Sequence, residues 1–190
     1  LYLNNGNKLS TTPPAAGSPG SRQLLNRLLS VASSGVPMFS AMLWSYLKVP
    51  QPGPVPAAID SSVSSTYFET DALTRNVVVI GTPYIVFRIK PNKSEYQLNF
   101  LIYDIDESGN ATLVSHQPYT CRTAAPGQTY DVRLQMNVLS HQFKAGHKIR
   151  LLVSTSDLMY SLPILRNFKV DVFFGPSSDA RLELPVAWTS

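Results

Sequence analysis

Between Val132 and Asp157, apolar and polar positions alternate along the chain. Apolar residues occupy every second position from Val132 to Val138, and the alternation returns from Ile149 to Val153. A period of two places each apolar set on one face of a strand. Gly146, between the two runs, allows a tight reversal that a residue with a Cβ would resist. The pattern predicts two strands of a β-sandwich that meet at a turn.

Short alternating runs recur through the rest of the chain after Tyr67, separated by turns rich in Pro, Gly, Asn and Ser. Leu1–Ser10 predicts a further pair of short strands around a glycine turn. Many short strands with no long helix between them are typical of a sandwich or jelly roll, so the predicted fold class is all-β. The later strands are predicted at Val77–Ile80, Tyr84–Lys90, Tyr96–Asp104, Thr112–Gln117, Tyr130–Val138, Lys148–Thr155, Lys169–Phe174 and Arg181–Val186.

Two of these strands carry large apolar residues at alternate positions, as expected for facing sheets. The two sets therefore predict the inner faces of the two sheets of a sandwich. They are Ile85, Phe87 and Ile89 in one strand and Leu98, Phe100 and Ile102 in the next.

A different spacing appears before Tyr67. Five apolar residues recur at helical spacing within Arg22–Ser33, and Ser21 is placed to cap a helix. A break at Ser34–Pro37 precedes Met38–Lys48, which is apolar on most sides. The prediction is a short helical insertion near the N-terminus. Stretches rich in Pro and Ser flank it at Thr11–Ser21 and Pro50–Ser65.

The segment Leu28–Leu47 contains no charged residue, which makes a membrane span an alternative to a helical hairpin. Five Ser, one Gly and Pro37 argue against a span, because they disfavour insertion and interrupt the backbone bonding that lipid demands. We therefore expect this segment to pack on protein rather than on lipid.

Composition supports a globular chain. Of 190 residues, 44% are hydrophobic and 15% charged, which excludes intrinsic disorder as the dominant state. A single cysteine, Cys121, excludes an internal disulfide framework. The net charge of +4 comes from scattered basic residues, so nucleic acid is not an expected partner. The chain opens inside a predicted strand, and we expect it to be part of a larger protein, with a cytoplasmic and a secreted or periplasmic location both open.

The sequence lacks the motifs of a complete hydrolase site. No Gly-x-Ser-x-Gly elbow is present, and the histidines, His116, His141 and His147, lie in or beside predicted strands. The stretch Asp104–Ser115 has oxygen-bearing residues at alternating positions, as in a calcium loop. Ser115 stands where a bidentate Glu is needed, so a hairpin turn is preferred and no metal is predicted.

Four stretches occur in the order found in a known family. They are Leu1–Leu3 with Lys8–Ser10, Thr70–Gly81, Ser140–Asp157 with its Gly-His-Lys-Ile-Arg-Leu run, and Arg181–Val186. In them the chain resembles the C-terminal domain of the X-Pro dipeptidyl-peptidase and cocaine esterase (CocE/NonD) family of serine hydrolases. The resemblance covers about residues 1–14 and 67–188, whereas 15–66 form a divergent helical and linker segment.

The resemblance implies one non-catalytic domain over residues 1–190, a jelly-roll sandwich similar to galactose-binding domains. It places the Ser-His-Asp triad of the family in an α/β-hydrolase domain upstream of Leu1. The expected partner is that domain, a homo-oligomer stays open, and no catalytic residue or cofactor is expected in this chain. His147 matches the Gly-His pair of the family and is interpreted as a packing or turn-bonding residue.

The candidate site residues are apolar and lie in the helical segment: Met38, Phe39, Trp44 and Tyr46. One interpretation is a small satellite core over one sheet. The other is that they contact the hydrolase domain and help to line its substrate pocket, which makes Arg22–Lys48 a docking element. A carbohydrate-binding module is the alternative function, and it calls for an exposed aromatic platform that the strands do not clearly offer.

Overall fold

The computed structural model describes residues 1–17, 20–26, 55–56, 63–157, 164, 166–176 and 178–187, and these contain strands and turns but no helix. The strands are β1 (Tyr2–Asn4), β2 (Lys8–Ser10), β3 (Gly20–Leu25), β4 (Val55–Pro56), β5 (Ser65–Glu69), β6 (Val77–Gly81), β7 (Tyr84–Pro91), β8 (Tyr96–Ile105), β9 (Asn110–Cys121), β10 (Tyr130–Gln135), β11 (Leu139–Phe143), β12 (Lys148–Ser154), β13 (Lys169–Phe174), β14 (Arg181–Glu183) and β15 (Val186–Ala187). The predicted all-β class is confirmed for the described residues.

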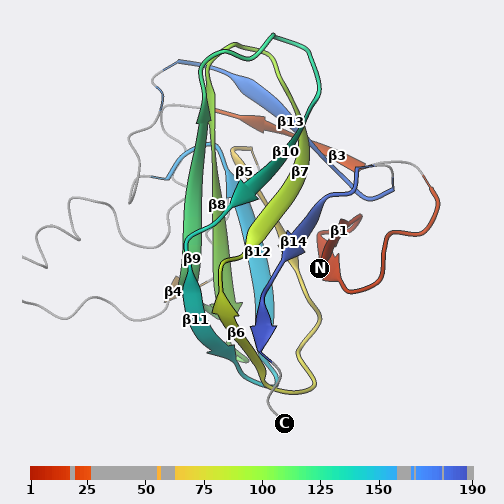
Figure 1. Ribbon diagram of the computed structural model, residues 1–190, viewed down its shortest axis with the longest axis vertical. Helices are drawn as coiled ribbons and strands as arrows, with labels where there is room; N and C mark the ends of the chain where they lie inside the picture. Colours follow the sequence, from red (N-terminus) through yellow and green to blue (C-terminus); the bar gives the residue numbers. More distant parts are fainter. Residues whose placement is uncertain are drawn as a thin grey trace, which may run out of the picture.

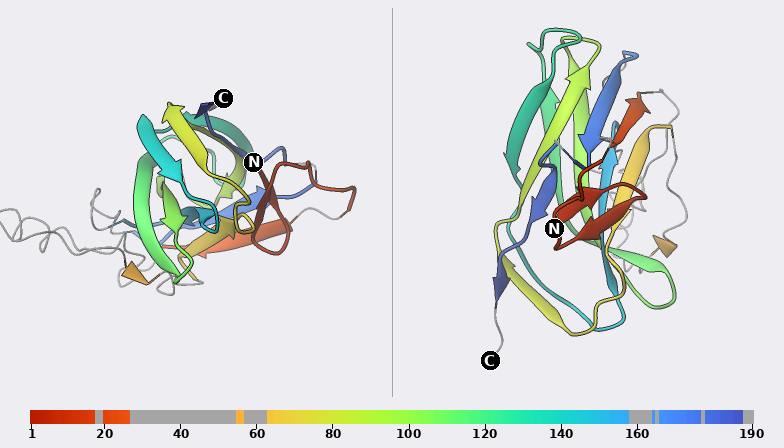
Figure 2. Two further views of the ribbon diagram at one scale, coloured as in Figure 1. Left: turned by 90° about the horizontal axis from the view of Figure 1, so that it is seen from below. Right: turned by 90° about the vertical axis from the view of Figure 1, so that its right-hand side faces the viewer.

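The strands form a sandwich that encloses one main core (Figure 1). The larger sheet has the order β3-β13-β7-β14-β1-β2-β5-β12-β8-β9-β4, with β10 paired to β7. Seen end-on in Figure 2, its strands surround a common interior. A second sheet of three strands, β11-β6-β15, lies at the lower end of Figure 1, near the C-terminus. We call it the small sheet.

Aromatic pairs join the two sides of the main core. The rings of Phe87 in β7 and Phe100 in β8 lie 4.6 Å apart, and those of Phe68 in β5 and Phe174 in β13 lie 5.1 Å apart. Along β7, buried and half-buried positions alternate. The six residues predicted as inner faces are all buried, which confirms that prediction. Each buried aromatic of this kind stabilises the fold by about 2–3 kcal/mol.

Strand β8 is buried on both faces. Phe100 and Ile102 belong to the main core, whereas Leu101, Tyr103 and Ile105 belong to a second apolar cluster. Because successive side chains point to opposite faces, the second cluster lies on the outer face of this part of the sheet. β8 therefore has no exposed position, and its polar residues Gln97, Asn99 and Asp104 are buried as well.

The predicted helix over Arg22–Ser33 is wrong at its start. Gly20–Leu25 is strand β3, which pairs antiparallel with β13 at each of its six residues. This pairing satisfies one side of the β3 backbone, and Leu24 is buried in the main core, which together outweigh the helical spacing of the leucines. Residues 27–54, which include the rest of the predicted helical insertion, lie outside the described residues.

The predicted turn after Tyr130–Val138 is also partly wrong. Leu139–Phe143 forms a strand, β11, which pairs with β6 in the small sheet. Consequently β10 and β12 are not hairpin partners: β10 pairs with β7, and β12 lies between β5 and β8. The reversal itself is confined to Lys144–His147, where Gly146 has the left-handed φ of +84°.

Two other local predictions are confirmed. β1 and β2 form the expected N-terminal hairpin, in register from Tyr2↔Ser10 to Asn4↔Lys8. Asp104–Ser115 spans the end of β8, a turn and the start of β9, as the hairpin interpretation requires. Within the described part of the chain, no helix is long and apolar enough to cross a membrane. The uncharged segment Leu28–Leu47 lies outside that part.

Candidate functional site

A cavity opens at the end of the sandwich where the small sheet meets β1. Its volume is about 360 Å³, and most of its lining is apolar. β6 contributes Val77 and Val78, and β15 contributes Val186 and Ala187. The other apolar lining residues are Leu1, Leu73, Ile149 and Leu184, and the polar ones are Thr11, Thr70, Arg75 and Asn76. We call it the end cavity; its size suits an apolar side chain or a small apolar group.

The loop that forms one wall of the end cavity is bonded at several points. Thr70 pairs with Ile149: its N–H donates to the Ile149 carbonyl at 3.0 Å, and its hydroxyl oxygen accepts from Ile149 N at 3.0 Å. Asp71 is paired with Lys8 of β2, and the hydrogen bond from Lys8 lowers the pKa of the Asp71 carboxyl. These contacts attach the loop to β12 through Ile149 and to β2 through Lys8.

The same loop is joined to the turn Lys144–His147. Leu73 N donates to the His147 carbonyl at 2.8 Å, and Gly146 N donates to the Leu73 carbonyl at 2.8 Å. The Asn76 side-chain carbonyl accepts from Ala145 N at 2.8 Å. The position of the cavity wall therefore depends on the position of this turn.

A buried carboxylate fixes the turn in its place. Asp104 of β8 bonds two imidazoles: its Oδ1 lies 2.7 Å from His147 Nδ1 and its Oδ2 lies 2.8 Å from His141 Nε2. Only 9% of the Asp104 side chain is exposed. His141 belongs to the small sheet, whereas Asp104 belongs to the larger one. The pair of bonds, which we call the Asp104 bridge, thus ties the two sheets together beside the end cavity.

An Asp–His pair is also part of a serine hydrolase triad, so its surroundings matter. In the described chain neither His141 nor His147 has a hydroxyl as a hydrogen-bond partner. The bonding role expected for His147 is the one observed. No group of three or more His, Cys, Asp or Glu side chains among the described residues is arranged to hold a metal ion. The Asp104 bridge joins β8 to β11 and to the turn Lys144–His147.

The turn with calcium-like spacing is closed by its own carboxylate. Asp106 Oδ1 accepts from Ser108 N at 2.9 Å and from Asn110 N at 2.8 Å, and its Oδ2 accepts from the Asn110 side chain at 2.9 Å. Those bonds, led by the Asn110 side chain, lower the pKa of Asp106. With its acceptors occupied, Asp106 serves a hairpin turn, as the sequence predicted.

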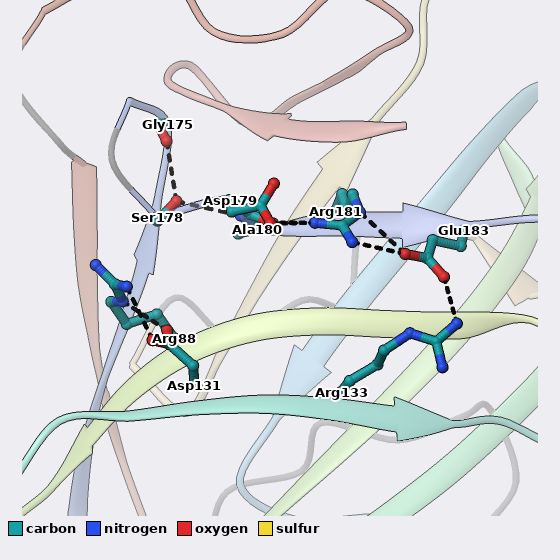
Figure 3. Close-up of polar contacts among 9 residues, drawn as sticks. All are labelled: Arg88, Asp131, Arg133, Gly175, Ser178, Asp179, Ala180, Arg181 and Glu183. Atoms are coloured by element: carbon teal, nitrogen blue, oxygen red, sulfur yellow. Dashed lines mark hydrogen bonds and ion pairs between the residues drawn. The ribbon is translucent and has the colours of Figure 1, made fainter.

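Charged side chains form a ladder on the exposed face of β7, β10 and β14 (Figure 3). Glu183 accepts from Arg133 at 2.7 Å and from Arg181 at 3.0 Å, and Arg181 also pairs with Asp179. The bond from Arg133 is the main cause of the lowered pKa of Glu183. On the same face, Arg88 and Asp131 form a bidentate ion pair, in which Arg88 Nε donates to Asp131 Oδ1 at 2.6 Å and Arg88 Nη2 donates to Asp131 Oδ2 at 2.9 Å (Figure 3). Since these charges neutralise one another, the face has little attraction for a charged ligand.

The candidate site residues from the sequence, Met38, Phe39, Trp44 and Tyr46, all lie outside the described residues. The end cavity was not predicted. Its lining comes from five separate parts of the chain, and apolar residues such as Val77 and Val186 carry no local signal that distinguishes a cavity wall from a core. The sequence does not predict the Asp104 bridge, because Asp104 lies 37 and 43 positions before its two histidine partners.

Comparison with known proteins shows that the chain matches a protein family. The sequence matches the model of the X-Pro dipeptidyl-peptidase C-terminal non-catalytic domain over residues 1–175, a range that includes 15–66. A search of the curated proteins found no match.

Solved structures share the fold. An α-amino acid ester hydrolase labelled with selenomethionine has a TM-score of 0.75 at 20% identity, and the match covers 98% of this chain. An aminopeptidase from a marine sediment archaeon, Thaumarchaeota archaeon, has a TM-score of 0.71 at 16% identity and 99% coverage. A CocE/NonD family hydrolase from Staphylococcus aureus has a TM-score of 0.68 at 11% identity and 99% coverage. In each case the match spans 36% of the other chain.

Proposed function

Because the chain belongs to the family of X-Pro dipeptidyl-peptidase C-terminal non-catalytic domains, we propose that it packs on the α/β-hydrolase domain of a serine hydrolase. The observation that carries the proposal is the family match over residues 1–175. The share of 36% in each solved relative agrees with a domain attached to a larger enzyme.

The proposed reaction of the whole enzyme is hydrolysis of an amide or an ester at an acyl group. The proposed substrate class is amino acid esters and peptides, among them peptides that begin with X-Pro, and the names of the relatives support it. A Ser-His-Asp triad in the hydrolase domain would form and break the acyl-enzyme. This chain would contribute packing surface and part of the wall of the substrate pocket.

Residues 1–190 would form one domain of the jelly-roll, galactose-binding-like type. Support comes from the crossed strand order, in which β7 lies between β13 and β14, and β12 lies between β5 and β8. Four residues of the segment 15–66 stay the proposed contacts with the substrate pocket: Met38, Phe39, Trp44 and Tyr46. Apolar and aromatic side chains of this kind commonly line such pockets.

Kinetics of the complete polypeptide test this function. With Ala-Pro-p-nitroanilide and p-nitrophenyl esters, we expect turnover by the complete polypeptide and none by residues 1–190 alone. Trp44→Ala and Phe39→Ala should raise KM while the serine nucleophile stays reactive towards a fluorophosphonate. Turnover by residues 1–190 alone that disappears in His147→Ala would contradict the proposal.

A further inference from the structure

Exposed apolar side chains gather on the small sheet. Among the described residues, four large apolar side chains are exposed, and Val63 is the one remote from this sheet. Ile80 of β6 is 56% exposed, Val186 of β15 is 41% exposed, and Val138, which directly precedes β11, is 74% exposed. Grouped exposed apolar residues mark interaction surfaces, whereas single ones do not.

Strand geometry connects this group with the end cavity. Ile80 and Val78 are two positions apart in β6, so their side chains point to the same face. Val78 lines the cavity, as does its cross-strand partner Ala187. On the other side of β6, Ile80 pairs with Ser140, two positions after Val138. Ile80, Val78 and Ala187 therefore carry one face of the small sheet to the cavity, whereas Val186, which pairs with Val79, points to the opposite face.

The small sheet also lacks charge. Its three strands, VVVIG, LSHQF and VA, contain no Asp, Glu, Lys or Arg. The face of β7, β10 and β14 differs, since it carries the paired charges of Figure 3. The centres of protein interfaces are depleted in charged residues, so the small sheet is the better docking surface of the two.

The first residue of the chain lies at this surface. Leu1 lines the end cavity, its N–H group donates to the Leu182 carbonyl at 2.8 Å, and Leu182 N donates back at 2.7 Å. A hydrolase domain upstream would therefore be connected to this domain beside the cavity. A domain tethered there is present at high effective concentration near the patch, which favours it over a separate partner.

We propose that the hydrolase domain of the same polypeptide seats an apolar side chain in the end cavity and covers Ile80 and Val138. This inference rests on the proposed function, and it places the contact at the small sheet. The Asp104 bridge and the bonded loop around Leu73 hold this surface ready before docking, which reduces the entropy lost on association.

The test uses the complete polypeptide with Ile80→Asp, Val138→Asp and the matched control Val63→Asp. A carboxylate placed in an apolar contact must be desolvated, so the first two changes should loosen the domains. We expect proteolysis of the chain before Leu1 to become faster by about tenfold, and unfolding to separate into two calorimetric transitions. The control should behave like the unchanged protein. Ile80→Ser and Val138→Ser repeat the comparison if an Asp variant does not fold.

The outcomes separate the two proposals. If the small-sheet variants match Val63→Asp while a serine upstream of Leu1 still reacts with a fluorophosphonate, the docking surface is wrong and the proposed function survives. If they convert a dimer into monomers with the domains still coupled, the surface binds a second copy and the inference is overturned. A polypeptide with no reactive serine overturns both.

Discussion

His147 Nδ1 lies 2.7 Å from Asp104 Oδ1, so a residue of the turn Lys144–His147 is bonded to strand β8, 43 positions earlier in the chain. The other oxygen of the same carboxylate bonds His141 of the small sheet. The backbone of the turn that contains His147 is also hydrogen-bonded to Leu73, in the wall of the end cavity. One buried carboxylate thus links the larger sheet, the small sheet and the proposed docking surface.

Asp104→Asn should destabilise the fold by about 1–3 kcal/mol, because an amide cannot accept hydrogen bonds on both sides and one half-buried imidazole loses its acceptor. Urea unfolding measures the loss. Asp106→Asn is the matched control, since Asp106 acts in an exposed turn, and its effect should stay within about 0.5 kcal/mol. Equal losses in the two variants would contradict the structural role of the Asp104 bridge.

Gly146→Ala should also destabilise the turn, for two reasons that can be separated. Gly146 has a φ of +84°, and a Cβ there would lie 2.2 Å from Glu107 Oε1. Gly127→Ala isolates the backbone cost of about 1–2 kcal/mol, because Gly127 has a φ of +80° and no atom within 4 Å of an added Cβ.

Thermal unfolding of both glycine variants gives the comparison. We expect Gly146→Ala to lower the melting temperature more than Gly127→Ala does. Adding Glu107→Ala to Gly146→Ala should bring the loss back to that of the control. A loss that is the same with and without Glu107→Ala would show that the contact has no role.

Phe87→Ala should cost about 3–5 kcal/mol, because it leaves a cavity in the main core where the ring meets Phe100 at 4.6 Å. Val63→Ala, at an exposed position outside the small sheet, should change the free energy of unfolding by no more than about 0.5 kcal/mol. Chemical denaturation of both variants tests whether Phe87 is central to the sandwich. Similar small losses would place the core elsewhere.

Acid should weaken the charged ladder of Figure 3. The pKa of Glu183 in the folded chain lies below its ordinary value of 4.5, mainly because Arg133 donates to it. This carboxylate therefore stabilises the fold above about pH 4.5, and the contribution is lost as the pH falls through the folded pKa. Glu183→Gln should flatten the pH dependence of unfolding below pH 4.5. An unchanged acid limb in Glu183→Gln would contradict this.

Alternation identified the strands whose inner faces carry large apolar residues. Lys169–Phe174 has the predicted bounds, and β7 and β8 begin at the predicted residues because their inner faces are large and apolar. Four strands, β3, β4, β5 and β11, lie where no strand was predicted, and the predicted strand Arg181–Val186 is divided between β14 and β15. β11 contains two buried residues, Leu139 and Phe143, among polar ones, and the glycine that follows drew attention to the turn.

β3 shows the opposite error. Leu24 and Leu25 share the spacing of a helix with the leucines that follow, yet their backbone bonds go to β13, almost 150 residues later. Local spacing holds no information about such a partner. The same limit applies to the end cavity, whose lining residues are brought together only by the pairing of β1, β6 and β15 with distant strands.

Labelling with a fluorophosphonate, followed by mass spectrometry of peptides, tests the central claim most directly. Applied to the complete polypeptide, it should modify one serine outside residues 1–190, within a Gly-x-Ser-x-Gly elbow. Residues 1–190 should carry no label, since their sequence contains no Gly-x-Ser-x-Gly elbow. Labelling of a serine within residues 1–190, or no labelling of the complete polypeptide, would contradict the account of a non-catalytic domain that serves a serine hydrolase.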